Sequence, residues 1–214
     1  MQITVKETDM KVENGRLIIN IDSDLEKLLG INKVVLSSVK PGQVIKNAIG
    51  IEYIVLEHLD NGSTRIIRKD LLPERMKFDD DNNNFSTSSL NKYLNDKYYR
   101  EEVIPGFGDG TVVVHNVDLL SLDGLDDYGT CDTKVGLLTI DDYRRYRKNC
   151  LKENMDSWWW LSTPDSTPSG YGGGYVQYVG GGGDVSYRGC GCWNGGVRPD
   201  FALQSSIFVS LPEA

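Results

Sequence analysis

Four residues have side chains that could support metal binding, redox chemistry or acid–base catalysis: Cys190, Cys192, His58 and His115. One residue separates Cys190 from Cys192, whereas zinc and dithiol motifs usually have a two-residue spacer, and a zinc site needs a second pair. Because the chain has only four cysteines, unevenly spaced, we expect free thiols. Each histidine falls in or after a predicted strand and is expected to be structural. We therefore expect no metal, no cofactor and no enzymatic activity.

Residues 165–194 indicate a different chemistry, that of recognition. Twelve of the 23 glycines lie between Gly170 and Gly196, with tyrosines, serines and aspartates interleaved. Tyrosine offers rigid contact area and the short polar residues form adaptable hydrogen bonds, whereas flexible linkers carry few such rings. We predict a ligand-binding surface formed by Asp165, Tyr171, Asp184, Ser186, Tyr187, Arg188, Cys190, Cys192 and Asn194. The alternative is a structural Gly-rich loop whose rings pack into the core.

The residues on either side of this segment indicate the framework that must position it. A block of three tryptophans ends at Trp160, and Gly-Val-Arg-Pro at residues 196–199 follows the segment. Large rings favour burial, so Trp159 and Trp160 are expected in the core. The guanidinium of Arg198 is expected to tie the loop to a sheet.

Apolar alternation and turn signals predict strands along much of the chain. Residues 53–56 and 63–67 flank Asp-Asn-Gly at residues 60–62, a strong signal for an antiparallel hairpin. Further short strands are predicted over residues 111–114, 119–122, 175–179, 184–188 and 197–208.

Two helices are predicted. Over residues 90–98, leucines and tyrosines recur at helical spacing after serines that can cap a helix. Thr139 is a plausible cap for a second helix that carries Tyr143 and Tyr146. The sequence therefore predicts an α+β fold, with a mostly antiparallel sheet, two main helices and a long Gly-rich C-terminal loop region.

Residues 79–84 form a run of three aspartates and three asparagines. Their oxygens could bind calcium, but the run lacks the glycine and the distant glutamate of an EF-hand loop. We favour a solvated loop here.

A chain of 214 residues suffices for one domain with a small appendage. Residues 1–37 are predicted to form an N-terminal hairpin or attachment element, and residues 38–214 the main domain. In the hairpin, Ile3 and Val5 lie on one strand, Asn-Gly at residues 14–15 forms the turn and residues 17–19 return. A first sheet of the main domain is the alternative interpretation of this element.

The net charge of −8 disfavours nucleic acid and anionic membranes as partners, because both attract basic surfaces. No apolar run reaches the roughly 18 residues that span a bilayer, so we expect no membrane insertion. The first residues lack the basic and then apolar pattern of a signal peptide, which predicts synthesis in the cytoplasm without one.

Several motifs, taken in order, resemble a group of bacterial and phage domains with the C-type lectin fold. They are Ser-Leu-Asn-Lys-Tyr-Leu-Asn at 89–95, Leu-Thr-Ile-Asp-Asp-Tyr at 138–143, Trp-Trp-Leu-Ser-Thr-Pro at 159–164, Tyr-Val at 175–176 and Gly-Val-Arg-Pro at 196–199. In the second motif Asp142 replaces the family's glutamate. The resemblance covers about residues 38–208 and implies a C-type-lectin-like fold.

Two better-known groups share that fold. Formylglycine-generating enzymes are similar in ending on a Gly-Phe-Arg motif, but they need a catalytic cysteine pair. Variable proteins of diversity-generating retroelements, often phage receptor binders, diversify Asn codons near the C-terminus to Tyr, Ser, Asp, Gly, Cys, Arg or Asn. Residues 184–194 resemble that repertoire.

Calcium-dependent lectins use Glu-Pro-Asn and Trp-Asn-Asp motifs, from which Thr163 and Gly195 depart, so calcium-mediated sugar binding is not expected.

The resemblance implies a non-enzymatic binder that presents residues 165–194 to a protein or glycan on another cell or particle. It leaves virion association and homo-oligomer formation open. One alternative is a formylglycine-type oxidase or other enzyme that uses Cys190 and Cys192. Another is a structural subunit whose Gly-rich segment packs against its neighbours.

Overall fold

The computed structural model describes residues 10–13, 16–19 and 33–212. The chain divides into two compact units, residues 1–33 and residues 34–214. In the first unit, strands β1 (Met10–Glu13) and β2 (Arg16–Ile19) form an antiparallel pair in which Val12 lies opposite Leu17. The predicted hairpin therefore returns through residues 16–19, but its partner strand is residues 10–13. Ile3 and Val5 lie outside the described residues.

The second unit contains a sheet of seven strands in the order β3-β14-β4-β5-β6-β13-β7. Neighbouring strands are antiparallel from β14 through β4, β5, β6 and β13 to β7. The predicted hairpin at residues 60–62 joins β5 to β6, and Gly62 takes a positive φ of 80° at its turn. The strands are β3 (Lys33–Val35), β4 (Val44–Lys46), β5 (Glu52–His58), β6 (Ser63–Arg68), β7 (Val112–Val113), β13 (Asp200–Gln204) and β14 (Phe208–Ser210).

A three-stranded antiparallel sheet holds the segment that was predicted to bind a ligand. It comprises β10 (Trp159–Pro164), β11 (Tyr175–Val179) and β12 (Val185–Gly189), with β12 at its edge. The predicted strand at 175–179 is confirmed, and the one at 184–188 is shifted by one residue. The final strand predicted over 197–208 is wrong, because a turn after Gln204 divides this stretch into β13 and β14.

A separate pair of strands, β8 (His115–Asp118) and β9 (Thr130–Thr133), is antiparallel. The strand predicted over 119–122 is wrong, because β8 ends at Asp118. The Asp118 side chain then accepts a hydrogen bond from the Leu120 backbone N–H, which is a turn contact rather than a strand contact.

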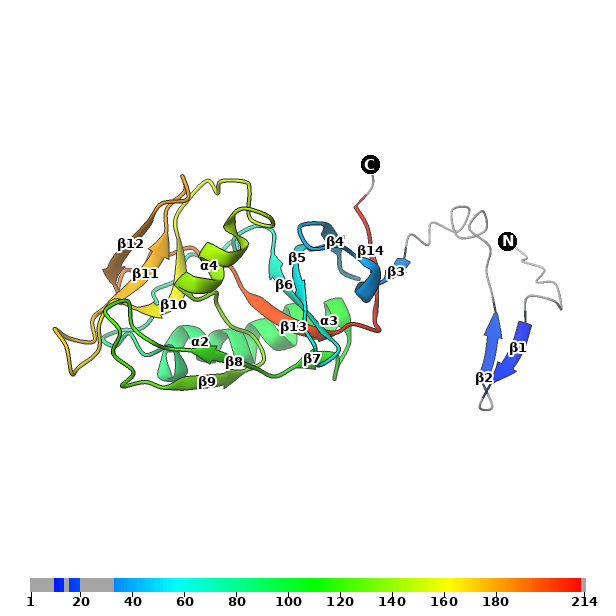
Figure 1. The fold of residues 1–214 in the computed structure, drawn as a ribbon, viewed down its shortest axis with the longest axis horizontal. Helices are drawn as coiled ribbons and strands as arrows, with labels where there is room; N and C mark the ends of the chain where they lie inside the picture. Colours follow the sequence, from blue (N-terminus) through cyan, green and yellow to red (C-terminus); the bar gives the residue numbers. More distant parts are fainter. Residues whose placement is uncertain (1–9, 14–15, 20–32, 213–214) are drawn as a thin grey trace. The chain divides into compact units, whose positions relative to one another are not determined.

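Both predicted helices are present, so the α+β class with mostly antiparallel sheets and two main helices is confirmed. The first is one continuous helical segment, α2 (Ser89–Tyr93), the π-helical stretch η4 (Leu94–Val103) and α3 (Ile104–Phe107). The second, α4 (Ile140–Arg147), begins with a capping box between Thr139 and Asp142 and lies along β10 (Figure 1). Short 3-10 turns occur at η2 (Leu36–Ser38) and η3 (Phe85–Thr87).

The tryptophan block joins two hydrophobic clusters, because successive side chains of β10 point to opposite faces of the sheet. Trp159 packs in the cluster beneath α4, with its ring 5.8 Å from that of Tyr143. Trp160 packs in the larger cluster, and its indole N–H donates to the Met76 carbonyl at 2.9 Å. Gly195 lies against this indole so closely that a Cβ would be 1.9 Å from the ring nitrogen. The expected burial of both rings is confirmed.

Candidate functional site

The predicted contact residues divide according to which side of β12 they occupy. Tyr187 is opposite Gln177 of β11, and Ser186 is opposite Tyr178. Side chains alternate along a strand, so Tyr187 points to one face of the three-stranded sheet, and Ser186 and Arg188 point to the other. The structure therefore does not gather the predicted residues into one flat surface.

The first face carries three exposed tyrosines, Tyr171, Tyr175 and Tyr187, which we call the tyrosine patch. Their exposed fractions are 69%, 48% and 56%. Tyr175 and Tyr187 are diagonal neighbours across β11 and β12, with ring centroids 5.6 Å apart in an edge-to-face contact. Gly189, which pairs with Tyr175, adds no side chain beside the ring. The alternative that these rings pack into the core is wrong.

Asp165 lies beneath the tyrosine patch and is buried, which corrects its assignment as a contact residue. One carboxylate oxygen accepts the Tyr171 hydroxyl at 2.5 Å, and the other accepts the buried Gln177 amide at 2.7 Å. The hydrogen bond that the Tyr171 hydroxyl donates to Asp165 raises the pKa of Tyr171 to about 12. A carboxylate in this position would be costly without these donors. Asp165 therefore supports the patch and is not presented to solvent.

The second face carries Arg188, which is exposed but not free. Its guanidinium lies 4.8 Å from the ring centre of Trp158 and 5.7 Å from that of Tyr178. Both rings are half-buried, so this stack fixes the guanidinium through cation–π contacts. Ser186 is half-buried on the same face. Asp184 is exposed at the turn before β12, where its carbonyl accepts the Gly180 N–H at 2.7 Å.

Cys190 is buried, and its assignment as a contact residue is also corrected. Its carbonyl accepts the backbone N–H groups of Phe78 and Asp79, which holds the loop against the core. Burial raises the pKa of the Cys190 thiol, which disfavours the reactive thiolate. Cys192 and Asn194 are half-buried and contact one another, with Sγ 3.0 Å from Oδ1. All four cysteines are free thiols.

Within residues 165–194, two exposed aromatic residues were not among the predicted contact residues. Tyr175 belongs to the tyrosine patch, and pairing the two predicted strands would have placed it beside Tyr187. Trp193 is 76% exposed and lies over a hollow of about 510 Å³ whose lining includes Met76, Leu90 and Tyr93. In the sequence, Trp193 stands out as a large ring in a Gly-rich loop. Large rings usually stabilise a fold through burial, and such a loop offers little of it.

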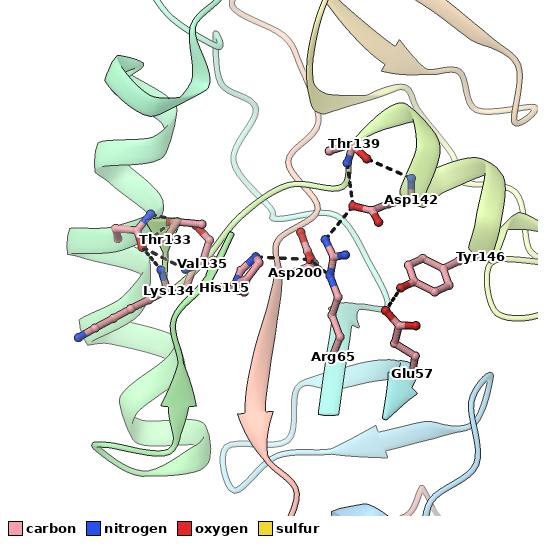
Figure 2. A network of polar contacts seen from close by, with 11 residues as sticks. Glu57, Arg65, His115, Thr133, Lys134, Val135, Thr139, Asp142, Tyr146 and Asp200 are labelled. Atoms are coloured by element: carbon pink, nitrogen blue, oxygen red, sulfur yellow. Dashed lines mark hydrogen bonds and ion pairs between the residues drawn. The ribbon is translucent and has the colours of Figure 1, made fainter. Parts of the chain in front are cut away.

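A second group of polar side chains surrounds Asp200 on β13, and we call it the Asp200 network (Figure 2). Arg65 donates from Nε to Asp200 at 2.6 Å and from Nη2 to Asp142 at 2.9 Å. Burial lowers the pKa of Arg65, but the two carboxylates outweigh it and the pKa lies above the usual value. His115 Nε2 is 4.0 Å from an Asp200 oxygen, too far for a hydrogen bond. Burial lowers the pKa of His115.

The geometry of the Asp200 network favours a structural role. Asp200 is fully buried and His115 nearly so. No hydroxyl or thiol among the described residues is hydrogen-bonded to His115, whose two ring nitrogens have no partner there. His58 is likewise structural, because it lies 2.8 Å from both the Thr64 hydroxyl and the Val39 carbonyl.

The acidic loop at residues 79–84 is more ordered than the predicted solvated loop. Asp79 is buried, and its carboxylate accepts N–H groups of Ser89 at 2.7 Å and Asn82 at 2.8 Å. Burial raises the pKa of this carboxyl, but the backbone donors, Ser89 foremost, outweigh it and the pKa lies below its usual value. Asp79 therefore anchors the start of α2. Within the described residues, no group of three or more His, Cys, Asp or Glu side chains is arranged to hold a metal ion.

No helix in the described part of the chain is long and apolar enough to cross a membrane. Comparisons of the chain with protein-family models, with curated proteins and with solved structures find no match. The candidate site therefore rests on the structure alone. The tyrosine patch, on β11, β12 and the loop before β11, is the best candidate because its side chains are exposed and adjacent.

Proposed function

We propose that this protein is a non-enzymatic binding protein that presents the tyrosine patch to a protein or glycan on another cell or particle. The exposure of Tyr171, Tyr175 and Tyr187 side by side carries the proposal. Clustered exposed rings mark interaction sites more often than rings that are scattered singly over a surface. Tyrosine rings also bind at low entropic cost, because few torsions are lost.

The support beneath the patch favours recognition over chance exposure. Asp165 holds the Tyr171 hydroxyl from below, and Gln177 holds Asp165. The patch is thus ordered before a partner arrives. Preorganisation increases affinity because less conformational entropy is lost on binding.

We further propose that the fold is C-type-lectin-like. The motifs that carry this resemblance fall on ordered elements of the main unit. Residues 89–95 lie on α2 and the start of η4, residues 138–143 at the start of α4, and residues 159–164 on β10. Arg198 donates to the carbonyls of Arg68 and Lys69 and so ties the loop to the end of β6. This is the contact that the sequence predicts for the guanidinium of Arg198.

Diversification of the C-terminal segment is part of the same proposal. Asp184, Tyr187 and Arg188 are exposed on or beside the edge strand β12, where substitutions disturb little packing. Cys190 and Asp165 are buried, so they are not among the positions that tolerate substitution.

The neighbouring DNA tests the proposal that the C-terminal segment is diversified. A reverse-transcriptase gene beside a near-copy of the 3′ coding end, differing only at adenines, supports it, and its absence contradicts it.

Binding itself can be tested with labelled protein on a panel of bacterial cells, some treated with periodate and some with protease. Loss of binding after periodate identifies a glycan, and loss after protease identifies a protein. Tyr175→Ala and Tyr187→Ala should each abolish retention. Phe208→Ala is the matched control, because Phe208 is a 65% exposed ring on β14 of the other sheet. Equal retention by all three variants contradicts the proposal.

A further inference from the structure

Arg198 is a buried cation whose hydrogen-bonding capacity is only partly used. Its exposed fraction is 3%, and its guanidinium lies 5.4 Å from the centre of the Trp159 ring. Nε donates to the Arg68 carbonyl and Nη2 to the Lys69 carbonyl, each at 2.9 Å. Nη1 makes no hydrogen bond with the described residues, yet it is not sealed from solvent. One edge of the guanidinium is thus occupied, and the end that carries Nη1 is open.

Arg65 and Arg198 are both buried but differ in their counter-ions. Arg65 contacts two carboxylates, those of Asp200 and Asp142 (Figure 2). Arg198 has no ion pair within the described part of the chain, and burial lowers its pKa to about 10. A buried charge without a partner is costly. The two backbone carbonyls offset part of that cost, and an anion at Nη1 would offset more.

Arg198 lines a cavity of about 260 Å³ between the end of β6 and the loop that follows α4. The lining combines three basic side chains, Lys69, Lys152 and Arg198, with three acidic ones, Asp70, Glu153 and Asp156. Lys69 is already paired with Glu52 at 2.7 Å. Asp70 and Glu153 are also the carboxylates whose charge acts on Arg198.

This balance of charge restricts the ligand. Phosphate, with its double negative charge, would be repelled by the three carboxylates, and an amine alone would leave Arg198 unpaired. We propose that the cavity binds a small zwitterion of the α-amino acid type, with its carboxylate on Arg198 and its ammonium group near Asp70 and Glu153. The site is separate from the tyrosine patch and does not depend on the function proposed for that patch.

The test is a titration of the full-length protein with single α-amino acids, followed through the Nε–H signal of Arg198 in ¹⁵N NMR spectra and through the thermal midpoint. At least one amino acid should shift that signal saturably. Acetate, methylammonium and inorganic phosphate serve as probes that carry only part of the ligand's charge pattern. Each should bind about tenfold more weakly or worse, since each lacks one charge-assisted contact or adds a repulsion.

Arg198→Lys lacks the Nε–H signal, so it is followed through the thermal midpoint alone, which amino acids should no longer raise. Its loss of the two carbonyl contacts can also unfold the protein. Asp70→Asn and Glu153→Gln are therefore the informative variants, because both residues are exposed and neither is hydrogen-bonded to the frame in the described structure. Each should weaken amino acid binding about tenfold and leave acetate binding unchanged or stronger. Asp126→Asn, an exposed carboxylate outside the cavity lining, is the control. Absence of a saturable shift, equal binding of phosphate, or unchanged affinity in both variants overturns the proposal.

Discussion

The tyrosine patch and the Asp200 network both place polar side chains over a buried aspartate, Asp165 directly after β10 and Asp200 on β13, but they stabilise that aspartate differently. Asp165 receives two neutral donors, a tyrosine hydroxyl and a glutamine amide. Asp200 receives the cation Arg65, which a second carboxylate also holds. A neutral donor that loses its acceptor costs less stability than a buried cation that loses one of its carboxylates. Substitutions at the patch should therefore cost less stability than substitutions in the network.

The largest effect is expected from Asp200→Ala. It leaves Arg65 buried with Asp142 as its remaining partner, and removal of one member of a buried pair costs about 3–5 kcal/mol of unfolding free energy. Chemical denaturation measures this loss. The control is Asp96→Ala, which breaks an exposed pair with Arg100 and should cost far less. Similar losses of unfolding free energy in the two variants would show that the Asp200 network stabilises the fold no more than an exposed ion pair does.

A smaller loss is expected from Asp165→Ala. The buried Gln177 amide loses its acceptor, which costs about 1–3 kcal/mol. The Tyr171 hydroxyl also loses its acceptor, so its pKa should fall from about 12 towards the usual 10.0. Denaturation and a spectroscopic titration of tyrosine measure the two changes. A Tyr171 pKa that stays near 12 would mean that Asp165 does not hold the hydroxyl.

His115 should make the network sensitive to pH. Burial holds its folded pKa below the usual 6.5, against the opposing charge of Asp200, with Arg65 and Asp142 also near. The unfolded chain then binds more protons than the folded one below about pH 6.5, so stability contributed by neutral His115 is complete above that pH. It declines as the pH falls towards the folded pKa. His115→Gln should flatten the slope of unfolding free energy between pH 6.5 and that pKa, and an unchanged slope would contradict this assignment.

The smallest change in stability is expected for the two exposed side chains Tyr187 and Arg188, on opposite faces of β12. Tyr187→Ala removes one edge-to-face contact with Tyr175, worth about 1 kcal/mol or less. Arg188→Ala removes a partly exposed stack on Trp158, worth a similar amount. The double variant should therefore keep a thermal midpoint near that of the wild type while losing ligand binding. A large drop in the thermal midpoint would show that these side chains belong to the structural core. The tyrosine patch and the Asp200 network would then differ less in their contribution to stability.

Local patterns were sufficient to predict several elements. The turn at residues 60–62, the capping box at Thr139 and the strand at 175–179 each depend on neighbours a few residues away, and the structure confirms them. The burial of Trp159 and Trp160 follows from their size, which leaves few favourable places outside a core.

Composition alone was misleading where the burial of a side chain depends on the tertiary fold. Asp165 resembles a surface residue in the sequence, but Tyr171 and Gln177 fold over it. Cys190 is buried because its loop hydrogen-bonds to Phe78 and Asp79, more than a hundred residues earlier in the chain. The last predicted strand was divided by a turn because β13 pairs with β6 and β7 while β14 lies between β3 and β4.

The sequence by itself determined that this chain is an acidic α+β protein with a rigid aromatic frame and a polar, ring-rich segment near its C-terminus. Only the tertiary structure decided that Tyr187 and Arg188 point to opposite faces of β12, that Asp165 lies beneath the patch and that Arg198 lines a cavity. The reason is physical. Helix caps and turns are fixed by short-range hydrogen bonds, whereas the face, depth and counter-ion of a side chain depend on which distant strand packs against it.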